Sequence, residues 1–254
     1  MANTFLTNPV LNKVPLVTAV FWLIKVLSTT VGETAADYLS VDLNFGMGTT
    51  SLIMLGLLAI FLSYQIIKNA YTPWVYWTNI VLVSVVGTLI TDNMVDNYGV
   101  TLETASLLFT VLLVLTFWLW HRTEGTLSIT SIHTRKREMF YWVAILFTFA
   151  LGTAIGDLAA ESMHLGFSKA LLMFAAVIGF IAIMHYLFDL NATLSFWLVY
   201  ILTRPLGASL GDLLSQPMAD GGLALGAMTT SMIFLGLILS GVTYLTLRNK
   251  SSEV

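Results

Sequence analysis

Four aspartates recur in register along otherwise apolar segments of this 254-residue chain. They are Asp37, Asp92, Asp157 and Asp212, and each follows a tryptophan by fifteen residues. An ionised aspartate in the centre of a membrane helix costs roughly 2.5–3.5 kcal/mol, so acids retained in such segments mark ion or proton pathways. Repetition at a regular spacing indicates repeated structural units. The spacing therefore predicts one acidic site built from four copies of the same unit.

Further acids lie on the same helical faces as these aspartates. Residues four apart share one face of a helix, and this spacing relates Glu33 to Asp37 and Glu161 to Asp157. The predicted cation ligands are Glu33, Asp37, Asp92, Asp96, Asp157, Glu161 and Asp212. Carboxylate, hydroxyl and carbonyl oxygens suit Mg²⁺, Ca²⁺ or Mn²⁺. We expect the four repeated aspartates to hold the metal directly.

Two bases also lie deep in the apolar segments, on faces that carry an acid. Lys25 precedes Glu33 by eight residues, and Arg204 precedes Asp212 by eight. Buried charges are expected to be paired. Lys25 and Arg204 are therefore either internal counter-ions or tethered cations that compete with a substrate cation and act in gating. Pro205, directly after Arg204, predicts an interruption of its helix beside the site.

Small residues adjoin the acidic faces. A glycine follows each tryptophan by ten residues, and two repeats carry a second glycine four residues further on. The predicted packing residues are Gly32, Gly87, Gly152, Gly156, Gly207 and Gly211. Small residues at this spacing let membrane helices approach closely. Packing of the four helices along this face would bring the aspartates near one another.

The composition is that of an integral membrane protein. Hydrophobic residues make up 57% and charged residues 10% of the chain, whereas soluble domains carry about 25% charged residues. Apolar runs of the spanning length, roughly 17–25 residues, predict eight helices. They lie at about 14–37, 50–67, 73–92, 102–120, 139–157, 168–188, 193–212 and 226–247. The longest polar stretch, 121–138, is expected to be a loop.

The signature falls on the first helix of each pair, which predicts four tandem two-helix repeats. Their expected ranges are 14–67, 73–120, 139–188 and 193–247, all within a single all-α membrane domain over 1–254. Two-helix units all have the same orientation in the membrane. The repeats are therefore expected to be parallel and related by a pseudo-fourfold or pseudo-twofold axis along the membrane normal.

Charge is distributed unevenly between the two expected membrane surfaces. The termini and the connections after even-numbered helices hold Lys13, Lys68, Arg122, Arg135, Lys136, Arg137, Arg248 and Lys250. The connections after odd-numbered helices hold only Lys169 as a base, and ten of the fourteen acids lie on that side. The positive-inside rule places both termini in the cytoplasm. The acidic surface outside is expected to concentrate cations.

Three segments carry a resemblance to a known family: FWLIKVLSTTVGETAADYL, YWVAILFTFALGTAIGDLAAE and FWLVYILTRPLGASLGDLL. The chain resembles bacterial membrane-anchored proteins built from four tandem two-helix repeats of unknown function, each with a characteristic tryptophan. The resemblance covers essentially the whole chain. In the second repeat Thr91 replaces the small residue before the aspartate. The resemblance implies the architecture and a bacterial inner-membrane location, and it implies no activity.

Several functions remain open from the residues. A transporter for a divalent cation, Mn²⁺ foremost, in exchange for protons is the leading hypothesis, because transporters place sites between internal repeats. A cation-selective channel and a structural membrane protein without transport are the alternatives. Paired aspartates could also serve an aspartyl protease, but four equivalent copies fit that mechanism poorly, so no enzyme activity is expected.

The expected partners are the metal ion or proton and the lipid bilayer. Neither a cofactor nor a nucleic-acid partner is expected, and the oligomeric state stays open. The chain has no cysteine, which excludes disulfides and thiolate metal ligands. No phosphate-binding glycine loop, nucleophile-elbow serine or zinc motif is present in the sequence.

Overall fold

The computed structural model describes residues 12–251, and over that range the chain is entirely helical and has no strand. The predicted number of eight α-helices is confirmed for these residues. The helices are α1 (Ala19–Asp37), α2 (Met47–Ile67), α3 (Pro73–Asp92), α4 (Leu102–Glu124), α5 (Arg135–Asp157), α6 (Gly166–Phe188), α7 (Ala192–Ser215) and α8 (Ala227–Ser251).

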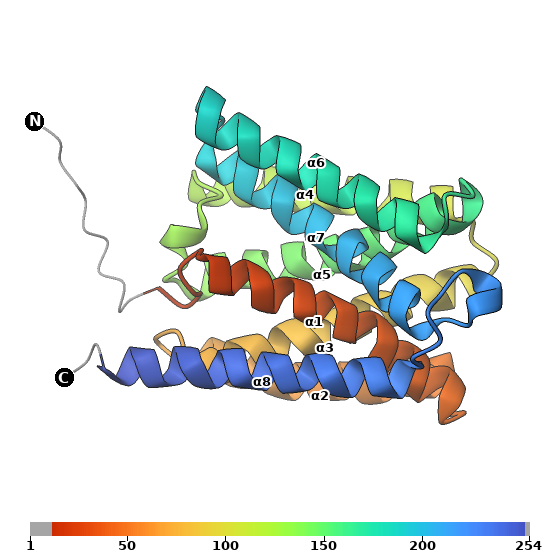
Figure 1. The fold of residues 1–254 in the computed structure, drawn as a ribbon. Coiled ribbons are helices and arrows are strands. Elements are labelled where there is room, and N and C mark those ends of the chain that lie inside the picture. Colours follow the sequence, from red (N-terminus) through yellow and green to blue (C-terminus); the bar gives the residue numbers. More distant parts are fainter. Residues whose placement is uncertain (1–11, 252–254) are drawn as a thin grey trace, which may run out of the picture.

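The four odd-numbered helices form an inner ring. Helix α1 packs against α3, α3 against α5, α5 against α7, and α7 returns to α1. Each even-numbered helix lies outside this ring, against the odd-numbered helix of the following repeat. Helix α6 accordingly lies beside α7, and α8 closes the circle beside α1 (Figure 1). Every repeat is therefore tied to the next, and the last repeat is tied to the first.

The glycine that follows each tryptophan by ten residues lies at a close contact between two inner helices. A Cβ atom at any of these glycines would overlap the side chain of a residue on the next inner helix. The four pairs are Gly32 with Ser84, Gly87 with Phe149, Gly152 with Arg204, and Gly207 with Thr29. Gly211 approaches Glu33 in a similar way, with 3.2 Å from its Cβ position to the Glu33 Cβ. The glycines therefore set the spacing of the ring.

The outer helices expose apolar surface. Leu52 on α2, Leu107 on α4, Leu172 on α6 and Leu239 on α8 are all at least 65% exposed. Six helices of the described chain are long and apolar enough to cross a membrane. The inner helices α1 and α7 do not reach this apolar level. They carry the charged residues Lys25, Glu33 and Arg204 on buried faces.

The connection between α4 and α5 is shorter than the sequence predicts. Helix α4 continues to Glu124 and ends at Gly125, which adopts a left-handed conformation. Helix α5 already begins at Arg135, because the Thr134 hydroxyl accepts a hydrogen bond from the Arg137 amide and caps the first turn. The expectation of a loop over 121–138 is therefore wrong. Polar residues at both ends of the stretch belong to helices.

The inner helices end in two different ways. In the first three repeats a π-helical turn follows the aspartate directly, at Tyr38–Asp42, Asn93–Asn97 and Leu158–Ser162. Such turns are rare and occur frequently at functional sites. Helix α7 instead continues past Asp212 to Ser215. Pro205 lies within this uninterrupted helix, so the predicted interruption is wrong.

A neighbouring helix accommodates Pro205. Its Cδ would lie 3.0 Å from a Cβ atom at Gly152, and its Cα and Cβ would lie 3.5 Å from one at Gly156. The missing side chains on α5 leave space for the proline ring. Tertiary packing thus holds α7 together where local preference would break it.

Candidate cation site

A cavity of about 320 Å³ lies where the inner helices reach their repeated aspartates. All seven acids predicted from the sequence line this acidic cavity: Glu33, Asp37, Asp92, Asp96, Asp157, Glu161 and Asp212. Gln216 and Asp220 line it as well. The sequence analysis did not single them out as ligands, although Gln216 lies four residues after Asp212 on the same helical face. Asp96, Glu161 and Asp220 are exposed, so the cavity reaches the surface at this end of the bundle.

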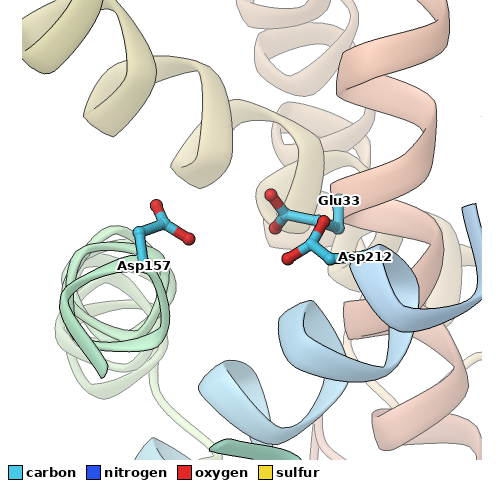
Figure 2. Close-up of side chains that lie close together, drawn as sticks. All are labelled: Glu33, Asp157 and Asp212. Atoms are coloured by element: carbon cyan, nitrogen blue, oxygen red, sulfur yellow. The ribbon is translucent and has the colours of Figure 1, made fainter. Parts of the chain in front are cut away.

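Three carboxylates converge inside the acidic cavity. One oxygen each of Glu33, Asp157 and Asp212 lie within 4.8 Å of one another. Figure 2 shows the three side chains reaching toward a common space from α1, α5 and α7. The residues belong to the first, third and fourth repeats, so the inner ring assembles them. We call Glu33, Asp157 and Asp212 the carboxylate cluster.

This cluster differs from the predicted set of four aspartate ligands. Asp37 and Asp92 line the same cavity but do not belong to the close group of oxygens. The Asp37 carboxylate accepts a hydrogen bond of 3.2 Å from the Gln216 side-chain amide. Glu33 lies one helical turn deeper in α1 and, with its longer side chain, takes part where an aspartate was expected.

The Asp212 carboxylate faces the acidic cavity and has no protein partner among the described residues. The residue is 8% exposed, and within residues 12–251 its carboxylate makes neither a hydrogen bond nor an ion pair. Buried polar groups normally have hydrogen-bond partners, and a buried charge is costly unless it is paired. An unpartnered acid that faces a cavity beside two other carboxylates is therefore suited to a positively charged ligand.

Arg204 does not line the acidic cavity but pairs with Glu33, which does. Its Nη2 donates to Glu33 Oε2 at 2.7 Å and to Thr153 Oγ1 at 2.8 Å, and also to Thr88 Oγ1. Its Nη1 donates to the backbone oxygen of Thr29 at 3.3 Å. One side chain of α7 thus contacts α1, α3 and α5. Arg204 pairs with an acid of another repeat, and the Asp212 carboxylate on its own helical face is not its ion-pair partner.

Lys25 has different surroundings from those the sequence predicts. It is completely buried, yet no carboxylate of the described chain lies within ion-pair distance of its ammonium group. The Nζ atom lies 4.2 Å from the ring centre of Phe149 and 4.3 Å from that of Tyr200. Thr203 Oγ1 lies 3.4 Å away. The expectation that Lys25 pairs with an acid is therefore wrong. Two aromatic rings contact its ammonium group instead.

The axis of the inner ring is filled below the repeated aspartates. The positions one, two and three helical turns before each aspartate are at most 6% exposed in all four inner helices. They are Glu33, Thr88, Thr153 and Ala208, then Thr29, Ser84, Phe149 and Arg204, then Lys25, Ile80, Ile145 and Tyr200. The acidic cavity is therefore open at one end of the bundle and closed toward the other.

A second charged cluster lies at the opposite end and was missed by the sequence analysis. Lys13 Nζ pairs with Glu138 Oε2 at 2.5 Å and donates to the backbone oxygen of Ile66 at 2.9 Å. Gln65 donates to Glu138 Oε1 at 3.0 Å. All three side chains are buried. No local pattern marks this cluster, because 125 residues separate Lys13 from Glu138.

Comparison with known proteins identifies the repeats. The family model described as "Repeat of Unknown Function (DUF347)" matches four successive segments, at residues 20–71, 75–126, 140–190 and 195–251. The chain therefore belongs to this family, which confirms the resemblance seen in the sequence. Among curated proteins no relative matches. Among solved structures there is likewise no match.

Proposed function

We propose that this member of the repeat family is a membrane transporter for a divalent cation, with Mn²⁺ as the first candidate substrate and protons as the exchanged ion. The observation that carries the proposal is the carboxylate cluster of Glu33, Asp157 and Asp212, which lies in a cavity open at one end only. Asp212, a member of this cluster, also supports it, because the residue is only 8% exposed and its carboxylate faces the cavity without a hydrogen bond or ion pair in the described chain.

The surface of the helices supports insertion into a bilayer. Soluble monomers rarely expose contiguous apolar patches larger than a few hundred Å², whereas the four outer helices expose leucines such as Leu52 and Leu172 along their length. The inner helices α1 and α7 would cross the membrane with their charges directed at the ring axis. The ring axis would then lie along the membrane normal, with the four repeats in pseudo-fourfold order.

Charge supports an orientation. Helix α1 begins and α8 ends at the same end of the bundle (Figure 1). The residues that line the acidic cavity lie at the other end, where α1 and α7 reach Asp37 and Asp212. Arg135, Lys136 and Arg137 lie at the end without the cavity. The positive-inside rule then places that end in the cytoplasm and the cavity on the outer side of a bacterial inner membrane.

The size and charge of the cluster support a divalent ion. Oxygens that bind one Mg²⁺ or Ca²⁺ lie at most about 4–5 Å apart, twice the metal–oxygen distance, and the cluster oxygens lie within 4.8 Å. Three ionised carboxylates and the Arg204 guanidinium together carry two net negative charges. A divalent cation would neutralise them. Asp37 and Asp92, in the same cavity but outside the cluster, offer sites for exchanged protons.

The filled axis favours a transporter over a channel. A channel needs a continuous pathway, whereas three successive layers of buried side chains lie below the repeated aspartates. A transporter exposes its site to one side at a time, and sites between repeats are typical of that mechanism. In this interpretation the structure represents a state that is open outward and closed inward.

The test is flux into liposomes that contain a metal-sensitive dye and, in parallel samples, a pH-sensitive dye. Mn²⁺, Mg²⁺ and Ca²⁺ would be compared for the native chain, Asp157→Asn and Asp212→Asn. Asp189→Asn is the matched control, because Asp189 is exposed at the end of α6 and its left-handed conformation suits asparagine.

We expect saturable flux of one divalent ion with proton movement in the opposite direction. Both cavity variants should lose this flux and the control should retain it. Flux that rises linearly with ion concentration and needs no counter-ion would indicate a channel instead. If no ion moves in the native protein, the acids are structural and the transporter proposal is rejected.

A further inference from the structure

Arg204 holds a position that no other side chain of the inner ring shares. Its Nη2 contacts Glu33, Thr88 and Thr153, and therefore reaches all three of the other inner helices. The residue is fully buried. Its Nε has no hydrogen-bond partner within the described chain. The guanidinium group thus joins four helices while one of its donors stays unsatisfied.

Glu33 serves two sites at once. Its Oε2 accepts the ion pair from Arg204 at 2.7 Å, and its carboxylate also belongs to the cluster with Asp157 and Asp212. A metal ion bound by the cluster would interact with the same Glu33 carboxylate that neutralises Arg204 in this structure. The guanidinium and the metal ion would therefore share one carboxylate, and two cations this close repel each other.

We propose that Arg204 is a built-in competitor of the transported cation for Glu33, and that the metal ion displaces it. The inference rests on the proposed function and specifies how the same site is regulated. Without a metal ion, Arg204 neutralises Glu33 and clamps the four inner helices together below the acidic cavity. Metal binding removes the ion pair and loosens the clamp, which frees the layer that closes the cavity.

The backbone is shaped to hold this competitor. A Cβ atom at Gly152 would overlap the Cβ and Cγ atoms of Arg204. The absence of a side chain at Gly152 therefore gives the Arg204 stem its place between α5 and α7. The corresponding glycines of the other repeats accommodate serine, phenylalanine and threonine, so only this contact carries a charge.

The test is Mn²⁺ affinity, measured by isothermal titration calorimetry on the full chain in detergent. Arg204→Gln is expected to bind Mn²⁺ about 5–150-fold more tightly, the range of typical coupling between two sites. Arg137→Gln is the control, because it makes the same chemical change in an arginine paired with Glu124 at the opposite end. Its affinity should equal that of the native protein.

A second background separates competition from a general effect of charge. In Glu33→Gln the carboxylate over which the two cations compete is absent. Adding Arg204→Gln to Glu33→Gln should therefore give no further gain in affinity. An equal gain in both backgrounds would mean that Arg204 acts through its overall field, and the competition would be rejected.

Thr153→Val tests the same idea in a variant that preserves the shape of the core. It removes one hydrogen bond that holds Arg204 without touching the carboxylate cluster. We expect Mn²⁺ to bind several-fold more tightly. Thr148→Val is the matched control, because Thr148 is equally buried on α5 and its hydroxyl bonds only to the backbone oxygen of Ala144. This pair decides the question even if Arg204→Gln does not fold.

The two proposals fail in different ways. If the native protein binds no Mn²⁺, Mg²⁺ or Ca²⁺ saturably, the proposed function is rejected together with the competitor. If the native protein binds Mn²⁺ but Thr153→Val and Arg204→Gln bind it equally well or less well, only the competitor is rejected. Arg204 is then a structural clamp.

Discussion

The two ends of the helical bundle handle buried charge in opposite ways. One end is that where α1 begins and α8 ends. There an ion pair of 2.5 Å joins Lys13 to Glu138, and further hydrogen bonds join Gln65 to Glu138 and Lys13 to the backbone. At the other end, Asp157 and Asp212 lie beside Glu33 with no ion pair of their own. Both groups are composed of side chains that a membrane protein tolerates poorly.

We interpret this difference as one between a structural cluster and the proposed cation site. A satisfied buried cluster is expected to add to the stability of one arrangement, because removing a partner leaves a charge unpaired. A group of like charges without partners lowers stability and is retained where a ligand compensates for it. Substitutions at the two ends should therefore change stability with opposite signs.

The largest expected effect is at the satisfied end. Glu138→Gln leaves the buried Lys13 ammonium without its counter-ion, and breaking such a pair costs about 3–5 kcal/mol. The measurement is chemical unfolding in detergent. Glu124→Gln is the control, because it removes an acid from the same end whose two basic partners, Lys136 and Arg137, both reach the surface. Equal stability of the two variants would contradict the structural assignment of the Lys13–Glu138 pair.

The second largest effect on stability is expected between the two ends, where α5 packs against α7 at Gly152 and Arg204. Gly152→Ala places a methyl group against the stem of Arg204, and overpacking of this kind costs typically about 1–3 kcal/mol. Gly179→Ala, on the outer helix α6, meets no atom within 4 Å. It should instead stabilise the helix by roughly 0.5–1 kcal/mol. Thermal unfolding of both variants checks the opposite signs, and destabilisation by Gly179→Ala would count against the arrangement of inner and outer helices.

The contrast between the ends also shows what the sequence could predict. The acids of the open end recur at a local spacing of four residues, so their common face and their common cavity follow from helical geometry. The pairing of Arg204 with Glu33 spans 171 residues, and the Lys13–Glu138 pair spans 125. Such contacts depend on which helices are neighbours in space, and helical periodicity carries no information about that.

The inner ring itself was only partly predictable. The repeated glycines indicate close packing, but they do not say that α8 returns to α1 or that each outer helix covers the next repeat. The choice of Glu33 over Asp37 for the carboxylate cluster depends on side-chain length and on the Gln216 contact. The π-helical turns after the first three aspartates leave the 3.6-residue period of the preceding helix, so periodicity gives no sign of them.

The two buried lysines provide a smaller and sharper test of the comparison. Lys25→Met replaces an ammonium group that contacts two aromatic rings and Thr203 but has no acidic partner in the described chain, and it should stabilise the protein by about 1 kcal/mol because a buried charge without a counter-ion leaves the core. Lys13→Met should destabilise it, because Glu138 then loses its partner. Unfolding curves of both variants give the signs. A loss of stability in Lys25→Met would show that the two aromatic rings are adequate partners for the ammonium group.

The smallest expected change in stability is at the acidic cavity. Asp212→Asn removes one of three clustered carboxylates, and relief of repulsion at about 4 Å in water amounts to at most about 1 kcal/mol. The variant should therefore unfold at an equal or slightly higher temperature than the native protein.

Added Mn²⁺ should produce a larger difference in stability between the native protein and Asp212→Asn. A ligand at about 100 times its Kd stabilises the folded state by about 2.7 kcal/mol, and the native protein should show this gain in thermal unfolding. Loss of a direct ligand should weaken binding by at least the 10–100-fold typical of outer-shell partners, so Asp212→Asn should show little gain at the same Mn²⁺ concentration. If Asp212→Asn is less stable than the native protein without Mn²⁺, Asp212 has a structural role like that of Glu138. The contrast between the two ends would then be rejected.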